Sequence, residues 1–329
     1  MKILIVDKSG IIPTINYGGT ERVIWGLGKE LTLLGHEVFY LVKEGSTCDF
    51  AEILVLKDEI NIESQIPKYI DIVHLNFRLK QPITSKPYLI TMHGNPSKEE
   101  LIDINTVFIS KNQAERYQSS MYVHNGLDWS DYPAPNLDTE RTYFHFLGKA
   151  AWKVKNVFGA AKIALESNNK LHIMGGKRWT FRNLKRGFGY VLNPKIIFRG
   201  MVDNNVKMDI MKNSKALLFP VSWHEPFGLA IIESLYAGCA VFGTKNGSLP
   251  ELITPEVGFI GDCSSEIVKA IQEFDYNPKL CHEYATKYFN SNRMAESYVI
   301  LYKKILSGDT LNQKVPQYDI ENNKIAIFN

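Results

Sequence analysis

Two glutamates eight positions apart are the residues best suited to bind a polyol. Glu225 and Glu233 lie in the stretch PVSWHEPFGLAIIESLYAG. We expect Glu225 to precede a helix with Pro226 in its first turn, and Glu233 to lie about two turns further on an apolar face. A buried carboxylate needs hydrogen-bond donors, and vicinal sugar hydroxyls can supply them to both oxygens. The alternative is structural: Glu225 interacts with the helix dipole, and Glu233 is a partly exposed helix charge.

A basic loop offers charge of the opposite sign. The segment FLGKAAWKVKN holds Lys149, Lys153 and Lys155 within seven residues. Two ammonium groups that converge from this loop would neutralise a diphosphate. Stabilising the charge that develops on a leaving group is worth about 3 kcal/mol per well-placed donor. The alternative for any one of these lysines is a solvated surface charge.

A glycine pair, Gly18-Gly19, lies between the first expected strand and the first expected helix. Backbone amides at a helix start bind anions, and a tight turn is the alternative. A nicotinamide site is disfavoured, because G-x-G-x-x-G should follow the strand directly. Here Gly18 lies eleven residues past Asp7, and the only early G-x-G, residues 26–28, falls inside the helix. The phosphate-loop pattern G-x-x-x-x-G-K-[ST] does not occur.

The composition is that of a globular chain with two domains. It has 329 residues, 45% of them hydrophobic, and a net charge of +3, which is too small to indicate nucleic-acid binding. Four scattered cysteines predict neither a disulfide framework nor a zinc cluster. The first residues lack the apolar length of a signal peptide, and no apolar run is long enough to span a membrane. We expect a cytoplasmic protein with reduced thiols.

The elements that must position these residues alternate between strand-like and helix-like patterns. In the first half, a helix at about 23–34 follows the first of six expected strands, at 2–7, 36–42, 71–76, 88–94, 106–110 and 121–126. After a linker at 131–138, strands are expected at 142–148, 171–175, 195–200, 216–220 and 240–244. Helices are expected at 156–167, 204–214, 227–238 and 290–306, and the tail after Gly308 is expected to be loosely held. Alternation of this kind predicts an α/β fold of two doubly wound, Rossmann-like domains with parallel sheets, facing across a cleft.

Four motifs in this order resemble the retaining glycosyltransferases of family 4, which have the GT-B fold. They are YGGTERVIWGLGKELTLLGHEV (17–38), HNGLD (124–128), EPFGLAIIE (225–233) and NGSLPE (246–251). The resemblance covers about residues 1–306. It implies an acceptor-side domain at 1–135, completed by a C-terminal helix at about 290–329, and a nucleotide-sugar-binding domain at 136–289.

The resemblance also implies roles for individual residues of the acidic stretch. Glu233 would hold the ribose hydroxyls of the donor, and Glu225 would bind hydroxyls of the donor sugar. Phe227, Gly228 and Leu229 would contact the sugar or phosphate. The remaining donor contacts would come from Gly18 and Gly19 on phosphate, and from Gly200 and Val202 near the base.

Three further positions match catalytic positions of the family. Lys149 and Lys155 match its basic pair on the diphosphate, although the family usually has arginine at the first, and lysine loses the bidentate fork. His93, in TMHG, matches the histidine beside the reacting sugar; the alternative is a histidine that only ends a strand. Ser248 stands where the family more often has a second glycine.

The function expected from this resemblance is transfer of a sugar from a nucleoside diphosphate sugar, with retained configuration. The acceptor would be a saccharide, a lipid-linked saccharide or another molecule. No D-x-D motif occurs, so neither a metal nor another cofactor is expected. The alternatives are a GT-B nucleotide-sugar epimerase, a non-catalytic nucleotide-sugar or glycan-binding protein and, last, a dehydrogenase. A basic segment at 177–186, with Trp179 and Phe181, would touch an anionic membrane surface, face a phosphorylated acceptor or form a solvated loop. The sequence does not set the oligomeric state.

Overall fold

The computed structural model describes residues 1–14 and 18–328, which form two compact units. Unit 1 contains Met1–Trp129 and Phe289–Asn323, and unit 2 contains Ser130–Tyr288 together with the tail from Lys324. The domain divisions expected after residues 135 and 289 stay a prediction. Tyr17 of the first motif lies outside the described residues. No helix in the described part of the chain is both long and apolar enough to cross a membrane.

Unit 1 is built on a six-stranded parallel sheet in the order β3-β2-β1-β4-β5-β6. Because the order reverses between β1 and β4, this sheet is doubly wound, as the sequence predicts. The six strands are β1 (Lys2–Val6), β2 (Glu37–Val42), β3 (Glu52–Val55), β4 (Ile72–Leu75), β5 (Tyr88–Met92) and β6 (Thr106–Phe108).

Two features of this sheet differ from the expectation. The edge strand β3 was not predicted; it has four residues and no fully buried position. The strand expected at 121–126 is wrong, because this segment makes only a single bridge, between Tyr122 and Phe108. One bridged pair leaves the rest of the segment without a ladder.

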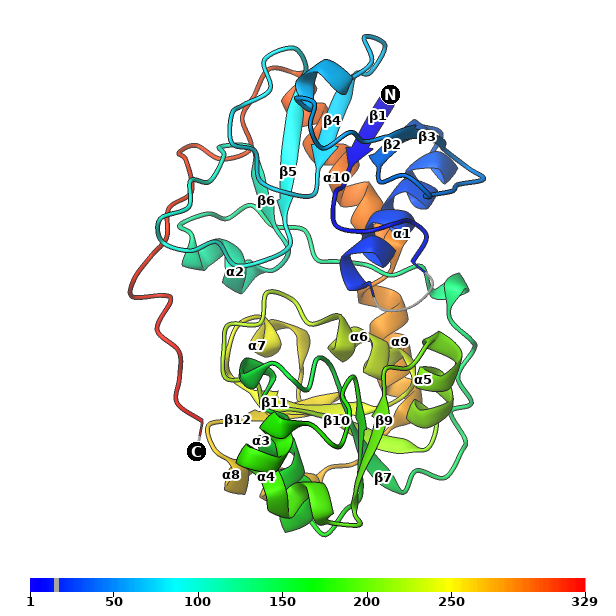
Figure 1. Ribbon diagram of the computed structural model, residues 1–329, viewed down its shortest axis with the longest axis vertical. Helices are drawn as coiled ribbons and strands as arrows, with labels where there is room; N and C mark the ends of the chain where they lie inside the picture. The colour runs from blue at the N-terminus through cyan, green and yellow to red at the C-terminus, as the bar shows by residue number, and fades with distance from the viewer. Residues whose placement is uncertain (15–17, 329) are drawn as a thin grey trace. The chain divides into compact units, whose positions relative to one another are not determined.

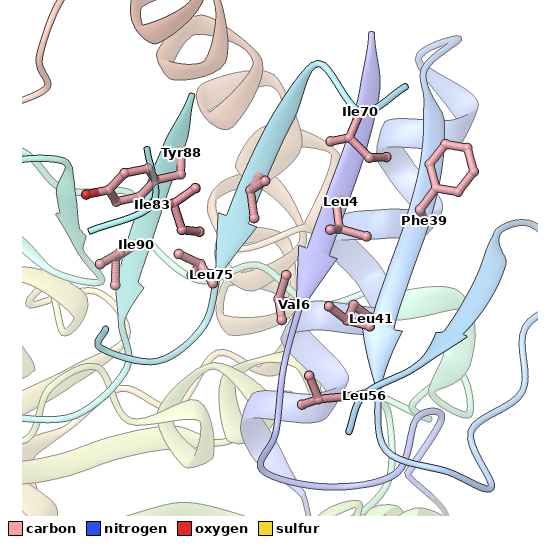
Figure 2. Close-up of a cluster of buried hydrophobic side chains, with 11 residues drawn as sticks. Leu4, Val6, Phe39, Leu41, Leu56, Ile70, Leu75, Ile83, Tyr88 and Ile90 are labelled. Carbon is pink, nitrogen blue, oxygen red and sulfur yellow. The ribbon is translucent and has the colours of Figure 1, made fainter. Parts of the chain in front are cut away.

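The alternation of side chains gives the unit 1 sheet two buried faces. Leu4 and Val6 of β1 point to one face, where they join a cluster with Phe39 and Leu41 of β2 (Figure 2). The opposite face packs against α1 (Gly19–Leu33) and α10 (Ser291–Leu306), which lie side by side although they come from opposite ends of the chain (Figure 1). Gly28 allows the close approach of α1, since a Cβ there would lie 1.9 Å from the Tyr40 hydroxyl oxygen.

A buried polar network joins α10 to the sheet. His74 of β4 bonds through Nδ1 to the Tyr302 hydroxyl (2.7 Å) and through Nε2 to Thr91 Oγ1 (2.7 Å), which in turn contacts the Tyr298 hydroxyl (2.8 Å). Burial lowers the pKa of His74 to about 3, so this ring is neutral at pH 7. The C-terminal helix is therefore part of the structure of unit 1.

Unit 2 repeats the same topology with the order β12-β11-β10-β7-β8-β9. The order reverses between β7 and β10. Its strands are β7 (Tyr143–Leu147), β8 (Leu171–Met174), β9 (Ile196–Gly200), β10 (Ser214–Phe219), β11 (Ala240–Thr244) and β12 (Gly258–Gly261). The helices of unit 2 are α3 (Val157–Glu166), α4 (Phe181–Leu192), α5 (Asn204–Met211), α6 (Leu229–Tyr236), α7 (Leu249–Leu252), α8 (Ser264–Glu273) and α9 (Pro278–Tyr288). The remaining short elements of the two units are α2 (Lys111–Arg116), η1 (Glu63–Gln65), η2 (Trp129–Asp131) and, in unit 2, η3 (Lys153–Lys155).

Two expectations are wrong, one about where helix α6 begins and one about the C-terminal tail. Helix α6 begins at Leu229 rather than 227, because Gly228 caps it with a φ of +87°, so Pro226 lies outside the first turn. As far as Asn323, the tail after Gly308 is not loosely held. Asn312 donates hydrogen bonds to the backbone oxygens of Ile104 (2.8 Å) and Thr106 (2.9 Å), and Asn323 donates to that of Arg116 (2.9 Å), which fix this part of the tail to unit 1.

Candidate functional site

The two loops that carry most of the predicted site leave neighbouring strands of unit 2. One follows β7 and the other follows β10, and these strands are paired where the strand order reverses. Asn156 Nδ2 donates to the Pro220 oxygen (2.8 Å), and Ser222 N donates to the Val154 oxygen (2.8 Å). Doubly wound sheets bind their ligands at this position, outside the carboxyl ends of the strands.

Lys155 and Glu225 form an ion pair between these loops. Lys155 Nζ lies 2.5 Å from Glu225 Oε2, and both side chains are largely buried. Trp223 Nε1 donates to the same oxygen at 2.9 Å, and the ammonium lies 5.0 Å from the centre of the Trp223 ring. In the described part of the chain, Glu225 Oε1 has no hydrogen-bond partner, so it can accept from a ligand hydroxyl.

Glu233 forms a second buried pair, on the first turns of α6. Its Oε1 accepts from Lys207 Nζ (2.5 Å) and from the Tyr132 hydroxyl (2.8 Å), and Glu233 is 8% exposed. The alternative of a partly exposed helix charge is therefore wrong. Both protein bonds reach one oxygen, which leaves Oε2 as the acceptor that could face a ligand.

Sequence reasoning missed the two partners of Glu233. Lys207 lies on the buried face of α5 together with Met208, Ile210 and Met211. A lysine among apolar positions of a short helix is the signal that could have revealed it, since buried lysines are rare unless paired. Tyr132 falls in the proline-containing segment that reads as a linker, and nothing local marks it.

The NGSLPE motif packs directly on the backbone of the acidic loop. Gly247 has a φ of +69°, and a Cβ there would lie 2.3 Å from the backbone nitrogen of Glu225. Ser248 N donates to the Glu225 oxygen (3.0 Å), and Ser248 Oγ donates to the Phe227 oxygen (2.7 Å). The serine that departs from the family pattern thus ties the two motifs together.

The other predicted donor-side residues of unit 2 lie in the loop after β7, beside the start of α6, and at and after the end of β9. Lys149 is exposed, with its ammonium 5.0 Å from the centre of the Trp152 ring, and Trp152 lies edge-on to Trp223 at 6.3 Å. Lys149 and Lys155 therefore contact two adjoining tryptophans. The remaining positions are buried Phe227 and Gly228, half-buried Leu229 at the start of α6, half-buried Gly200 at the end of β9, and half-buried Val202 between β9 and α5.

His93 lies in unit 1, at the carboxyl end of β5. It lines a pocket of about 320 Å³ together with Lys8, Asn76, Arg78 and Glu100. Its Nε2 lies 2.9 Å from Asn76 Oδ1, and burial lowers the pKa of His93 to about 4. The histidine is therefore neutral at pH 7 and belongs to a formed pocket.

The glycine loop of unit 1 has an acidic neighbour. Gly18 has extended backbone (φ 177°) and precedes α1, and a Cβ there would lie 2.8 Å from Glu21 Oε2. Buried Asp7 accepts a hydrogen bond from Ser9 Oγ at 2.5 Å in the same loop. The negative charge of these carboxylates would repel a phosphate bound at this point. The phosphate-binding role of Gly18 and Gly19 stays a prediction.

Two further expectations concern metals and the basic segment at 177–186. Among the residues that the structure describes, no group of three histidine, cysteine, aspartate or glutamate side chains could hold a metal ion. Metal independence stays a prediction.

Trp179 is exposed in the basic segment at 177–186, and Phe188 is exposed in α4. The side chains of Phe181, Arg182 and Arg186 lie outside the described residues. Membrane contact stays a prediction.

Comparison with known proteins gives a family match and similar proteins. Residues 129–289 match the model of the family described as glycosyl transferases group 1. An uncharacterised 42.6 kDa protein of the Klebsiella pneumoniae cps region is 29% identical over 112 residues, which is 31% of this chain but only 28% of that protein. The N-acetyl-alpha-D-glucosaminyl L-malate synthase of Bacillus anthracis is 24% identical over 92% of this chain and 98% of its own length.

Solved structures share the fold over nearly the whole chain. AviGT4, a glycosyltransferase involved in avilamycin A biosynthesis, aligns with a TM-score of 0.76 at 20% identity, covering 94% of this chain and 99% of its own. Anabaena HepE, solved in complex with UDP and glucose, aligns with a TM-score of 0.63 at 15% identity, covering 92% and 100%. The chain therefore has the GT-B fold, and the match of residues 129–289 to the group 1 model supports a glycosyltransferase.

Proposed function

We propose that this protein transfers a sugar from a nucleoside diphosphate sugar to an acceptor, with retention of the anomeric configuration. The observation that carries the proposal is the placement of two buried lysine–glutamate pairs, Lys155–Glu225 and Lys207–Glu233, within the segment that matches the group 1 family. The relative solved with UDP and glucose supports a nucleoside diphosphate donor. The resemblance to family 4 supports retention.

The donor would bind through the carboxylate oxygens that the protein leaves open. Glu233 Oε2 would accept from ribose hydroxyls, because Oε1 is already bonded to Lys207 and Tyr132. Glu225 Oε1 would accept from a hydroxyl of the sugar, because Oε2 is bonded to Lys155 and Trp223. Both carboxylates are held by these bonds before the ligand arrives, so less side-chain entropy is lost on binding.

The lysines of the loop after β7 would stabilise the departing diphosphate. Lys155 is held by Glu225 and by two aromatic rings, at 5.0 Å from Trp223 and 5.2 Å from Phe219. A preorganised ammonium in a partly dry site stabilises developing negative charge without reorganisation. Exposed Lys149, on the Trp152 ring, would supply a second and more mobile positive charge.

The bond changes follow from a front-face attack. The bond from the anomeric carbon to the diphosphate oxygen breaks, and a bond to the acceptor oxygen forms on the same face of the sugar. The diphosphate takes the electron pair of the broken bond and the proton of the acceptor hydroxyl. This mechanism requires neither a side chain that acts as a covalent nucleophile nor a metal ion.

The first experiment identifies the donor and then tests the lysine and the glutamate. A thermal-shift screen of nucleoside diphosphate sugars should raise the melting point with the true donor. Lys155→Met should then lower kcat by about a hundredfold, because a donor to the leaving group is lost. Glu233→Gln should weaken donor binding by about tenfold. Lys162→Met, an exposed lysine on α3, is the control and should leave both unchanged.

The outcomes separate the alternatives. Unaltered transfer in both Lys155→Met and Glu233→Gln would refute the assigned site. An epimerised donor formed without any acceptor would identify an epimerase, and donor binding with neither transfer nor hydrolysis would identify a binding protein. The anomeric configuration of the product, read by NMR coupling constants, tests retention directly.

A further inference from the structure

The pocket around His93 is built from three adjacent strand ends of unit 1. Lys8 follows β1, Asn76 follows β4 and His93 follows β5, and these strands are neighbours in the sheet. The pocket lies where the strand order reverses, between β1 and β4. Its volume of about 320 Å³ is at the lower end of the range for small-molecule sites. It therefore suits a small molecule or the end of a larger one.

The charges that line this pocket are mainly positive. The Lys8 ammonium lies over the Phe77 ring, 4.3 Å from its centre. Arg78 forms an ion pair with Glu100. Hydrogen bonds from the Ser97 amide and then from Arg78 lower the pKa of Glu100, so this carboxylate stays charged. With two cations and one carboxylate, the lining carries a net charge of +1 at pH 7.

His93 adds a hydrogen-bond acceptor rather than a charge. Asn76 Nδ2 donates to the Val6 oxygen (3.2 Å), which orients the amide so that its Oδ1 faces His93 Nε2 (2.9 Å). Nε2 must therefore carry the ring proton, and Nδ1 carries the lone pair. Burial lowers the pKa of His93 to about 4, so this tautomer persists at pH 7.

We propose that this pocket binds the acceptor substrate through an anionic group, a carboxylate or a phosphate, held by Lys8 and Arg78. A hydroxyl of the same molecule donates to His93 Nδ1. Asn76 is a positioning residue that fixes the tautomer of His93. The identification of the ligand as the acceptor rests on the proposed function, whereas the anion site itself does not.

The test uses small anions as probes on the full chain. Inorganic phosphate and succinate are titrated by NMR in the presence of saturating UDP, which occupies the proposed diphosphate loops of unit 2. Glycerol is the uncharged probe. We expect both anions, or one of them, to shift the amide signals of Gly94 and Asn95, and glycerol to leave them unchanged. Binding of only one anion identifies the acceptor group as a phosphate or as a carboxylate.

Charge variants test which side chains hold the anion. Lys8→Gln and Arg78→Gln should each weaken binding by about tenfold, and Lys8→Arg should restore it. Glu100→Gln removes the competing carboxylate of Arg78 and should tighten binding by about threefold. Lys57→Gln, an exposed lysine of unit 1 outside the pocket, is the control and should bind as the wild type does.

Specific results would overturn the anion site. These are the absence of shifts at Gly94 and Asn95 with both anions, or an equal loss in Lys57→Gln, which would show only a general charge effect. Unchanged anion affinity in both Lys8→Gln and Arg78→Gln would also overturn the anion site. A nucleotide sugar that binds and reacts while anions do not bind here would refute this proposal alone. Anion binding without any nucleotide-sugar binding would refute the proposed function and leave the anion site standing.

Discussion

Replacing Lys207 by methionine tests the buried pair that orients Glu233. Lys207 Nζ lies 2.5 Å from Glu233 Oε1, and the two side chains are 9% and 10% exposed. At an effective dielectric constant of 20, the attraction between unit charges at this distance is about 7 kcal/mol, much of which desolvation offsets. Removing one partner of such a pair costs about 3–5 kcal/mol, because the other charge stays buried.

The expected loss lies at the lower end of that range. Methionine preserves the length and much of the volume of the lysine side chain, so little packing is lost. The Tyr132 hydroxyl still donates to Glu233 at 2.8 Å, so the carboxylate keeps one hydrogen bond. We therefore expect Lys207→Met to lower the free energy of unfolding by about 3 kcal/mol.

A double-mutant cycle in urea measures the pair. Wild type, Lys207→Met, Glu233→Gln and the double variant are unfolded and followed by circular dichroism. A chain with two units need not unfold in one step. The transition to analyse is therefore the one whose urea midpoint increases when the nucleotide ligand is added. The double variant should be more stable than the sum of the single losses predicts, by about 2 kcal/mol.

A surface pair at the C-terminal end of α5, the helix that carries Lys207, provides the control. Lys212 forms an ion pair with Asp209 and is 44% exposed, so Lys212→Met should change the free energy of unfolding by less than about 0.5 kcal/mol. In the binding assay, Lys207→Met should weaken nucleotide binding by about tenfold, because Glu233 loses its orientation. A loss in Lys207→Met no larger than that in Lys212→Met, with additive cycle energies, would refute the argument from burial.

Three other predictions follow from particular residues and from the sequence. Burial lowers the pKa of His74 from 6.5 to about 3 in the folded protein, so the free energy of unfolding falls as the pH drops from about 6.5 towards 3. His74→Gln should reduce the slope of the free energy of unfolding against pH by about 1.4 kcal/mol per pH unit in this range, measured by unfolding at a series of acid pH values. Gly247→Ala has a positive φ (+69°) and places Cβ against the Glu225 backbone, so it should lower the free energy of unfolding by more than about 2 kcal/mol. Gly308→Ala also has a positive φ, but its Cβ meets open space, so it should lower the free energy of unfolding by about 1 kcal/mol. Equal losses in the two variants would contradict the clash at Gly247. Transfer should keep its rate in EDTA, and a loss that Mn²⁺ restores would contradict the metal-free mechanism.

Most of the two sheets could be predicted from the sequence, because parallel strands buried on both faces appear as short apolar runs. Strands β1, β4 and β10 are of this kind. Strand β3 escaped prediction because it is a short, partly exposed edge with a weak pattern. Residues 121–126 show the opposite failure: their pattern suits a strand, but only Tyr122 pairs with the sheet.

The sequence by itself predicted most of the residues that could do the chemistry, although their roles stay predictions. The Glu–seven residues–Glu spacing, the basic loop and the glycines are local features, and their order along the chain was enough to suggest a GT-B glycosyltransferase. The apolar neighbours of Glu233 suggested a buried face but left a partly exposed helix charge as the alternative, which the structure then excluded.

Only the tertiary structure decided how those residues are partnered. Lys155 meets Glu225 across 70 positions of sequence, Lys207 meets Glu233 across 26, and Tyr132 meets Glu233 across 101. Each contact joins segments that no local pattern connects. Which side chains meet is set by the order of the strands and by the packing of loops and helices around their carboxyl ends, and this order is a property of the whole fold.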